Sequence, residues 1–491
     1  MRIPFDNSYA QLGAPLSVPQ TPEAVEEPAL IRVNEPLGKL LGLPEGWLHS
    51  EEALQTFAGN AVPEGATPVA SAYAGHQFGS FNPQLGDGRA VLLGEVVGAN
   101  GQRFDIQLKG SGRTAWSRGG DGRSPLGPVI REYIVSEAMA ALGVPTTRAL
   151  AAVTTGERVY RDTAEPGAIL TRVAASHLRV GTLQFFAARE DRDSLTRIID
   201  YVLTHHYPDA AENTRGNRAL ALLRSVVGAQ ATLIARWQLL GFIHGVMNTD
   251  NMLLSGETVD YGPCAFMENF DPATVFSSID YQGRYAYANQ PAIGQWNLSR
   301  LAEAVLPMIH DDTDTAVELA TAEIQAFPDL FGSAYRLELA RKLGVSELTM
   351  DDTLLIDGLF EALEEDKTDF TLAFRYLAES VAPGSSGCGA SSLFEPGQTL
   401  LEWIPQWMQR QAQEEKSVEE RQATMLAASP AFIPRNHLIQ QAIEAGEAGD
   451  YAPFHRLVDR LAQPSIYDAA DRDLALPAKP EERVFRTFCG T

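Results

Sequence analysis

The stretch that decides the fold is "HGVMNTDNMLLSGETVDYG", residues 244–262. Asn251 follows His244 by seven residues, and a short apolar segment with a turn then leads to Asp260-Tyr261-Gly262. Asn251 and Asp260 offer hard oxygen atoms of the type that Mg²⁺ prefers. A long apolar segment precedes the stretch, so its polar residues are expected on a loop beside a buried helix. This order predicts a metal-binding loop, and a simple polar turn is the alternative.

The spacing matches the phosphate-transfer loop of protein kinases with one exception. In kinases an Asp two residues after the His accepts the substrate's proton, while an Asn and a second Asp hold Mg²⁺. Here that position is Val246, which cannot accept a proton. Asp250 stands directly before Asn251 and could serve an acceptor that enters from another angle. The loop therefore predicts phosphate chemistry with a displaced base.

Bulk composition restricts the class of protein. The chain has 491 residues, of which 45% are hydrophobic and 21% charged, as in globular proteins with a core. A net charge of −24 argues against nucleic acid or an anionic membrane as the main partner. The start of the chain lacks a secretory signal, and the apolar stretch 219–245 contains two arginines, which favours a buried helix over a membrane span. We therefore expect a cytoplasmic protein.

The order of segments predicts an α+β fold with two lobes, like that of protein kinases. Short apolar runs joined by Gly-rich turns predict a strand-rich part, and a helix is expected between Ser124-Pro125 and Gly143. The residues up to about 70 look irregular apart from a helical stretch at 29–43. The expected divisions are an N-terminal extension (1–70), an N-lobe (71–175), a helical C-lobe (176–382), and a C-terminal helical extension with a tail (383–491).

A lysine at the end of a predicted strand is the first candidate for phosphate binding. Lys109 ends "FDIQLK", and taken alone it would be an exposed lysine on a sheet edge. Paired with a carboxylate on the following helix, it becomes an oriented phosphate clamp. That helix offers Glu132, which its position favours, and Glu137 as the alternative.

Three clusters of Gly and Arg provide the second candidate. Gly86 and Gly88 precede Arg89, and "GSGRT" (110–114) and "RGGDGRS" (118–124) follow. Glycines let backbone N–H groups approach phosphate oxygens, and arginines supply planar double donors. Such patterns also occur in ordinary turns, but three of them within 40 residues of an acidic chain favour a nucleotide site.

Two arginines in "ILTRVAASHLRVG" would determine the orientation of a bound nucleotide. Arg172 and Arg179 fall in the segment that joins the two predicted lobes, where kinases hold adenine. As surface residues in ion pairs they would contribute little. If both point into the cleft, the terminal phosphates lie at this segment and the α-phosphate lies nearest the metal.

Three long motifs resemble the selenoprotein O family of kinase-like protein nucleotidyltransferases: "YAGHQFGSFNPQLGDGRA", "QLKGSGRTAWSRGGDGR" and "HGVMNTDNMLLSGETVDYGPCAFM". The resemblance covers most of the chain and includes the end, "TFCGT". It implies a kinase fold that binds ATP in inverted orientation, with Mg²⁺ or Mn²⁺. It also implies transfer of AMP, or of UMP from UTP, to Ser, Thr or Tyr hydroxyls of proteins, possible self-modification included. A monomer is expected, although the oligomeric state stays open.

The resemblance also implies roles for individual residues. Asp250 would accept the proton, Asn251 and Asp260 would hold the metal, and Glu132 would pair with Lys109. The residues implied in nucleotide binding are Gly86, Gly88, Arg89, Lys109, Asp121, Gly122, Arg172, Arg179 and Asp260. Two other functions stay open: a kinase that transfers the γ-phosphate, against which Val246 argues, and a non-catalytic nucleotide-binding scaffold.

The three cysteines exclude a disulfide scaffold and a cysteine-only zinc site. Cys489 stands where members of the family carry selenocysteine, and Cys264 lies four residues after Asp260. We predict a reversible disulfide between Cys264 and Cys489, which requires Cα atoms within about 7 Å. Two unrelated thiols are the alternative, and Cys388 in a Gly/Ser loop looks incidental.

Overall fold

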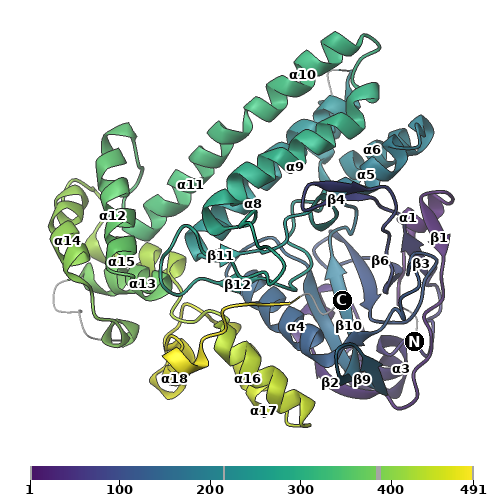
Figure 1. Ribbon diagram of the computed structural model, residues 1–491, viewed down its shortest axis with the longest axis horizontal. Coiled ribbons are helices and arrows are strands. Elements are labelled where there is room, and N and C mark those ends of the chain that lie inside the picture. Colours follow the sequence, from purple (N-terminus) through teal and green to yellow (C-terminus); the bar gives the residue numbers. More distant parts are fainter. Residues whose placement is uncertain (1–2, 214–215, 383–388, 489–491) are drawn as a thin grey trace.

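The computed structural model describes residues 3–213, 216–382 and 389–488 (Figure 1). They form a mixed α/β structure with one eight-stranded antiparallel sheet and many helices. The strands are β1 (Ser17–Pro19), β2 (Ala29–Val33), β3 (Val69–Ser71), β4 (Gly75–Gln77), β5 (Ser80–Asn82), β6 (Ala90–Val97), β7 (Arg103–Lys109), β8 (Ser124–Pro125), β9 (Arg148–Tyr160), β10 (Ala164–Ala174), β11 (Phe242–Ile243) and β12 (Ala265–Phe266).

The helices dominate the chain after residue 175 and lie mostly on the other side of the molecule from the sheet (Figure 1). They are α1 (Ser8–Gln11), α2 (Glu35–Leu40), α3 (Glu51–Phe57), α4 (Leu126–Ala141), α5 (Val180–Ala187), α6 (Arg192–His206), α7 (Pro208–Glu212), α8 (Arg218–Leu240), α9 (Gln290–Val305), α10 (Thr313–Gln325), α11 (Phe327–Leu343), α12 (Thr353–Glu365), α13 (Phe370–Ser380), α14 (Gln398–Gln411), α15 (Val418–Ala428), α16 (Asn436–Glu447), α17 (Ala452–Leu461) and α18 (Arg472–Ala475).

The register of the central strands places two of the predicted phosphate-binding residues on one face. The strand order is β1-β3-β6-β7-β10-β9-β2, and β8 also pairs with β10. In the β7–β10 pair, Arg172 stands opposite Gln107, and Lys109 lies two residues beyond Gln107 on β7. Because side chains alternate between the faces of a strand, Lys109, Gln107 and Arg172 share one face of the sheet.

Helix α4 lies against this face and is buried along most of its length. It contacts β9 and β10 on one side and α16 and α17 on another (Figure 1). It begins after Pro125 and ends where Gly143 adopts a φ of 77° that favours glycine. The predicted limits of this helix are confirmed within two residues, and α4 carries Glu132 toward the sheet.

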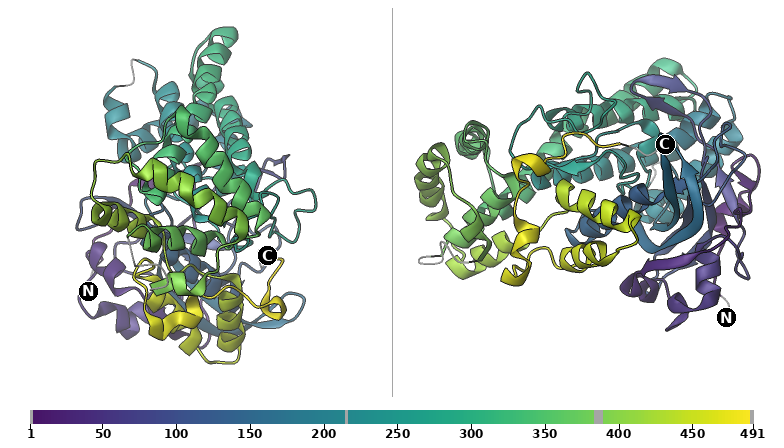
Figure 2. Two further views of the ribbon diagram at one scale, coloured as in Figure 1. Left: turned by 90° about the vertical axis from the view of Figure 1, so that its left-hand side faces the viewer. Right: turned by 60° about the horizontal axis from the view of Figure 1, so that its bottom comes forward.

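The N-terminal segment is more ordered than the sequence suggested. Strand β1 pairs with β3, and β2 pairs with β9, so both edges of the sheet come from the first 33 residues. Figure 2 shows this purple segment at the outer edge of the molecule, next to the blue strands. The helix predicted for 29–43 is wrong in its first part, because residues 29–33 pair with β9 and the Asn34 side chain caps α2 by accepting from Leu37 N.

Helix α8 is the central helix of the helical part. By length and composition it is the one helix among the described residues that could cross a membrane. However, 61% of its apolar window is buried inside the protein, and it contacts α6, α9, α10 and α11. It ends at Gly241, whose φ of 68° closes the helix just before β11. The burial agrees with the predicted buried helix that leads into residues 244–262.

Candidate active site

A cavity of about 540 Å³ lies between the sheet, α4 and the 244–262 loop. Every predicted site residue other than the cysteines lines it, and these residues come from β7, α4, β10, the start of α5 and several loops. They are Gly86, Gly88, Arg89, Lys109, Asp121, Gly122, Glu132, Arg172, Arg179, Asp250, Asn251 and Asp260. Val246, the residue in place of the kinase base, lines the cavity as well.

Three cations and two carboxylates form a closed network on one side of the cavity. Lys109 Nζ lies 2.5 Å from Glu132 Oε2 and 3.3 Å from Asp260 Oδ1. Arg172 Nη2 lies 2.5 Å from Glu132 Oε1 and 2.7 Å from Asp260 Oδ1. Arg179 Nη1 lies 2.7 Å from Asp260 Oδ2. The network has one more positive than negative charge, so it favours an anion in the cavity.

Burial decides between the alternative interpretations of these residues. Lys109, Arg172 and Arg179 are only 8%, 2% and 4% exposed, so an exposed edge lysine and surface arginines are both wrong. Burial lowers the pKa of Lys109 while Glu132 opposes this effect. Burial alone would raise the pKa of Glu132 and of Asp260, but Arg172 and its neighbouring cations hold both values below their usual range. Both carboxylates are therefore ionised partners of the cations.

Glu137, the alternative partner of Lys109, faces a different strand. Its Oε1 accepts from Arg148 Nε at 2.9 Å and from Ala149 N at 2.8 Å. Its Oε2 accepts from Asn34 Nδ2 at 2.7 Å. Glu137 therefore ties α4 to β9 and to the N-terminal segment, and Glu132 is the residue that contacts Lys109.

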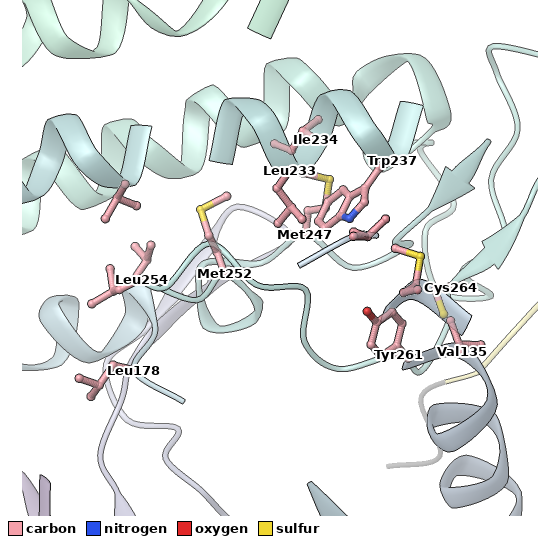
Figure 3. Packing of buried hydrophobic residues seen from close by; sticks show 14 of the residues in the cluster. Val135, Leu178, Leu233, Ile234, Trp237, Met247, Met252, Leu254, Tyr261 and Cys264 are labelled. Atoms are coloured by element: carbon pink, nitrogen blue, oxygen red, sulfur yellow. The ribbon is translucent and has the colours of Figure 1, made fainter. Parts of the chain in front are cut away.

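Apolar packing against α8 and one buried histidine fix the loop at 244–262. Met247 lies against Leu233 and Trp237 of α8 in Figure 3. The buried His244 ring donates from Nε2 to Val259 O at 2.9 Å and accepts from Val246 N at 3.4 Å. These contacts join the two ends of the loop and bring Asn251 and Asp260 to the same cavity.

Asp260 has an unusual backbone conformation. Its φ of 63° lies in the left-handed region, which costs a non-glycine residue about 1–3 kcal/mol. Its side chain accepts from Arg172, Arg179 and Lys109. We infer that these ion pairs stabilise the strained backbone and aim the carboxylate into the cavity.

Asp250 lies at another part of the cavity wall and is 7% exposed. Its Oδ2 accepts from Gln77 Nε2 at 3.1 Å, and its backbone oxygen accepts from Arg179 Nη1 at 2.5 Å. Burial raises the pKa of Asp250 to about 6, against the opposing effect of Arg179. The neighbouring Asn251 donates from Nδ2 to Val246 O at 3.0 Å, so its amide oxygen is the end turned away from that carbonyl.

Two of the three Gly/Arg clusters, 110–114 and 118–124, pack against each other, and residues of the second line the cavity. Gly112 N donates to Gly122 O at 3.0 Å, and a Cβ on Gly122 would lie 2.0 Å from Gly112 O. Only glycine fits this approach, and the φ of 67° at Gly122 adds a second reason. Asp121 pairs with Arg161 at 2.8 Å, and this hydrogen bond lowers the pKa of Asp121. These two clusters therefore hold each other in a defined conformation.

The sequence did not predict the contacts that fix the segment from Ala175 to Arg179. The Arg179 guanidinium lies 4.7 Å from the ring centre of Tyr73. Asp105 accepts from His177 N at 2.8 Å, and Glu257 accepts from Ala175 N at 3.0 Å. No local pattern predicts these contacts, because they join segments more than 70 residues apart.

The cysteine prediction stays a prediction. Cys264 is buried beside Tyr261 and Val135 (Figure 3). Cys489 and Cys388 lie outside the described residues. The tail reaches the neighbourhood of Cys264 at Thr487, whose Oγ1 donates to Pro263 O at 2.5 Å.

Residues able to hold a metal are few. Within residues 3–213, 216–382 and 389–488, no group of three or more His, Cys, Asp or Glu side chains could hold an ion. Asn251 and Asp260 both line the cavity, and each could supply one oxygen ligand. Two protein ligands suit Mg²⁺, which keeps several waters and shares its site with substrate phosphates.

Comparison with known proteins shows the family to which the chain belongs. The family model described as "Protein adenylyltransferase SelO" matches residues 1–462. A relative named "Protein nucleotidyltransferase YdiU" from Bradyrhizobium sp. strain BTAi1 is 55% identical over 492 residues, covering 100% of both chains. Relatives of the same name from Rhodopseudomonas palustris strain BisB5 and Rhizobium leguminosarum bv. trifolii strain WSM2304 are 52% and 53% identical, covering 100% of this chain and 100% and 97% of theirs. The chain belongs to the SelO family of protein adenylyltransferases.

Proposed function

We propose that the protein transfers AMP from ATP to the hydroxyl groups of Ser, Thr or Tyr in proteins and releases pyrophosphate. The observation that carries the proposal is the buried network of Lys109, Arg172 and Arg179 on the strand-rich side of the cavity. Three fixed cations fit the terminal phosphates of a nucleotide and leave the α-phosphate toward the 244–262 loop. The sheet with α4 and the helical part would then be the two lobes of a kinase-like fold.

The remaining lining residues fit the rest of the nucleotide. Gly86 and Gly88 give backbone access, and Arg89 adds a cation. Asp121 and Gly122 belong to the Gly/Arg cluster 118–124 and line the cavity. UTP offers the same triphosphate, so UMP transfer is a second activity of the same site.

A divalent ion, Mg²⁺ or Mn²⁺, would be held by Asn251 and Asp260 together with phosphate oxygens. When bound, it supplies positive charge that neutralises the phosphates. Asp260 already lies among three cations, so its ionised form is maintained before any ion arrives. The donor set therefore fits a metal shared with the nucleotide.

The chain's own residues provide the proton transfer. The acceptor hydroxyl gives its proton to the Asp250 carboxylate while its oxygen forms a bond to the α-phosphorus. The bond between the α-phosphorus and the bridging oxygen breaks, and that oxygen leaves with pyrophosphate. Lys109, Arg172 and Arg179 stabilise the charge on the leaving group.

Labelled ATP distinguishes this reaction from its alternatives. The protein is incubated with Mg²⁺ or Mn²⁺, a mixture of peptides containing Ser, Thr and Tyr, and ATP labelled at either the α or the γ position. We expect the α-label on peptide or on the protein itself, with release of pyrophosphate. Incorporation of γ-label alone would restore the kinase interpretation. Nucleotide binding without incorporation of either label would favour a scaffold.

We also propose a cellular location and an oligomeric state for the protein. The acidic chain and the buried α8 fit a cytoplasmic monomer that works on protein substrates, without nucleic acid or membrane as a partner. Light scattering of the purified protein tests the monomer, and self-labelling tests whether the chain is its own substrate.

A further inference from the structure

A small hairpin covers the loop that carries Asp250. It consists of β4 and β5, residues 75–82. His76 N donates to Thr249 Oγ1 at 2.7 Å, and Phe78 N donates to Asn248 Oδ1 at 3.0 Å. Between these two residues, Gln77 Nε2 donates to Asp250 Oδ2 at 3.1 Å. Three consecutive hairpin residues therefore contact three consecutive loop residues.

The hairpin also closes the other side of the Asp250 carboxylate. A Cβ on Gly75 would lie 2.4 Å from Asp250 Oδ1, which is too close for any side chain. Oδ1 is buried and accepts no hydrogen bond from the described residues. The carboxylate is therefore held between a backbone wall at Gly75 and a single side-chain donor, Gln77.

Contacts behind the hairpin keep it in place. Thr249 Oγ1 donates to Gln184 Oε1 at 2.7 Å, and Gln184 Nε2 lies 2.9 Å from His76 Nδ1. Tyr285 OH donates to Asn248 Oδ1 at 2.6 Å. Because α5 and residue 285 lock the hairpin and the loop together, Gln77 has a fixed position relative to Asp250.

We propose that Gln77 is a positioning residue that orients the Asp250 carboxylate toward the acceptor hydroxyl. The inference rests on the proposed function, in which Asp250 takes the acceptor's proton. An amide donor suits this task because it fixes one carboxylate oxygen without adding a charge that would compete for the proton. Gln77 and Phe78 also line the cavity, so the hairpin forms part of the wall that an acceptor approaches.

Substitutions at Gln77 in the full-length protein test this role. Gln77→Ala removes the donor, Gln77→Glu places a second carboxylate beside Asp250, and Gln77→Asn keeps an amide on a shorter side chain. Gln84→Ala is the matched control, since Gln84 lies in the same segment but is exposed and does not line the cavity. Turnover with α-labelled ATP and a Ser/Thr/Tyr peptide mixture is measured together with the Kd for ATP and the unfolding temperature.

We expect Gln77→Ala to lower kcat roughly ten- to a hundredfold, as befits the loss of a hydrogen bond to a charged group. Gln77→Glu should lose more and Gln77→Asn less, while the Kd for ATP stays within about twofold because Gln77 contacts none of the phosphate-binding cations. Gln84→Ala should behave as wild type. A Gln77→Ala enzyme with unchanged kcat, or one whose kcat loss is matched by weaker ATP binding or a collapsed unfolding temperature, would overturn the proposal.

A double substitution separates positioning from a structural role. If Gln77 acts through Asp250, then Gln77→Ala should cost nothing more in an Asp250→Ala background. An additive loss would contradict the proposal. Failure of the wild-type enzyme to incorporate α-label would overturn the proposed function and this inference together, whereas wild-type incorporation with indifferent Gln77 variants would overturn the inference alone.

Discussion

The two sides of the cavity hold their carboxylates in opposite ways. On one side, Glu132 of α4 and Asp260 of the 244–262 loop contact Lys109, Arg172 and Arg179 at 2.5–3.3 Å. On the side of the hairpin, the Asp250 carboxylate accepts from one neutral side chain among the described residues and lies against glycine backbone.

The difference matches the chemistry proposed for each side. Carboxylates among cations have pKa values below their usual range and stay ionised, which suits ligands and partners of phosphate. A buried carboxylate binds a proton more readily, and burial raises the pKa of Asp250 to about 6 although Arg179 opposes this rise. Charge fixes the proposed nucleotide side of the cavity, whereas shape and an amide contact fix the proposed acceptor side.

The largest effect is expected from neutralising the carboxylate that three cations share. Asp260→Asn should reduce AMP transfer by at least about a thousandfold, because the proposed metal ligand is also the charged partner of three cations. Asn tolerates the φ of 63° at this position, so the fold should survive. Label transfer and thermal unfolding measure the two effects.

Asp260→Ala serves as the comparison for that variant. It loses the same charge but also the side-chain hydrogen bonds and the tolerance of a left-handed backbone, so it should unfold at a lower temperature than Asp260→Asn. Equal unfolding temperatures would show that the ion pairs do not stabilise the strained backbone. Retained transfer in Asp260→Asn would remove Asp260 from the metal site.

A smaller effect is expected from the two buried arginines. Replacing Arg172 and Arg179 together by Gln should weaken ATP binding by roughly a hundredfold or more and adenosine binding far less, because the lost contacts are to phosphate. Calorimetry with both ligands measures the difference. Similar losses for ATP and adenosine would mean that these arginines support the fold instead, and the inverted orientation would lose its basis.

The smallest effect is expected at Asp105, which accepts from the backbone N–H of His177, two residues before Arg179. Burial raises the pKa of Asp105 to about 7, so the folded protein binds this proton more tightly than the unfolded chain does. The stability contributed by the protonated group is complete below about pH 4 and is lost as the pH rises through about 7. Asp105→Asn cannot ionise, and its unfolding temperature should therefore fall by a few degrees less than that of wild type between about pH 5 and about pH 8. Parallel curves for the two proteins would contradict this.

The parts that sequence predicted well are those with strong local patterns. The β6–β7 hairpin follows from two apolar runs around a Gly/Asn turn, and the limits of α4 follow from Pro125 and Gly143. Once strand and helix were placed, contact between Lys109 and a carboxylate of α4 could be expected. The choice of Glu132 over Glu137 came from its position in the first turns of the helix.

The parts that sequence did not predict depend on long-range contacts. Strands β1 and β2 take their extended form from partners at least 50 residues away. Gln77 meets Asp250 across 173 residues, and "GHQF" has neither helical nor strand periodicity strong enough to place it. Arg161, which directly follows β9, donates to Asp121 across 40 residues. Tertiary packing decides such contacts, and one sequence carries no direct record of it.

Segments from both ends of the chain pack against the sheet and α4, and this limits where the chain could be shortened. Strand β2 borders β9 on one edge of the sheet, while α16 and α17 cover the helix that carries Glu132. Arg131 on that helix donates to Asn436 Oδ1 at 2.9 Å. A fragment restricted to residues 71–382 would therefore expose a bare sheet edge and the apolar flank of α4. The cavity is therefore not part of an independent module. A shortened version of this enzyme would need other segments to pair with β9 and to cover α4.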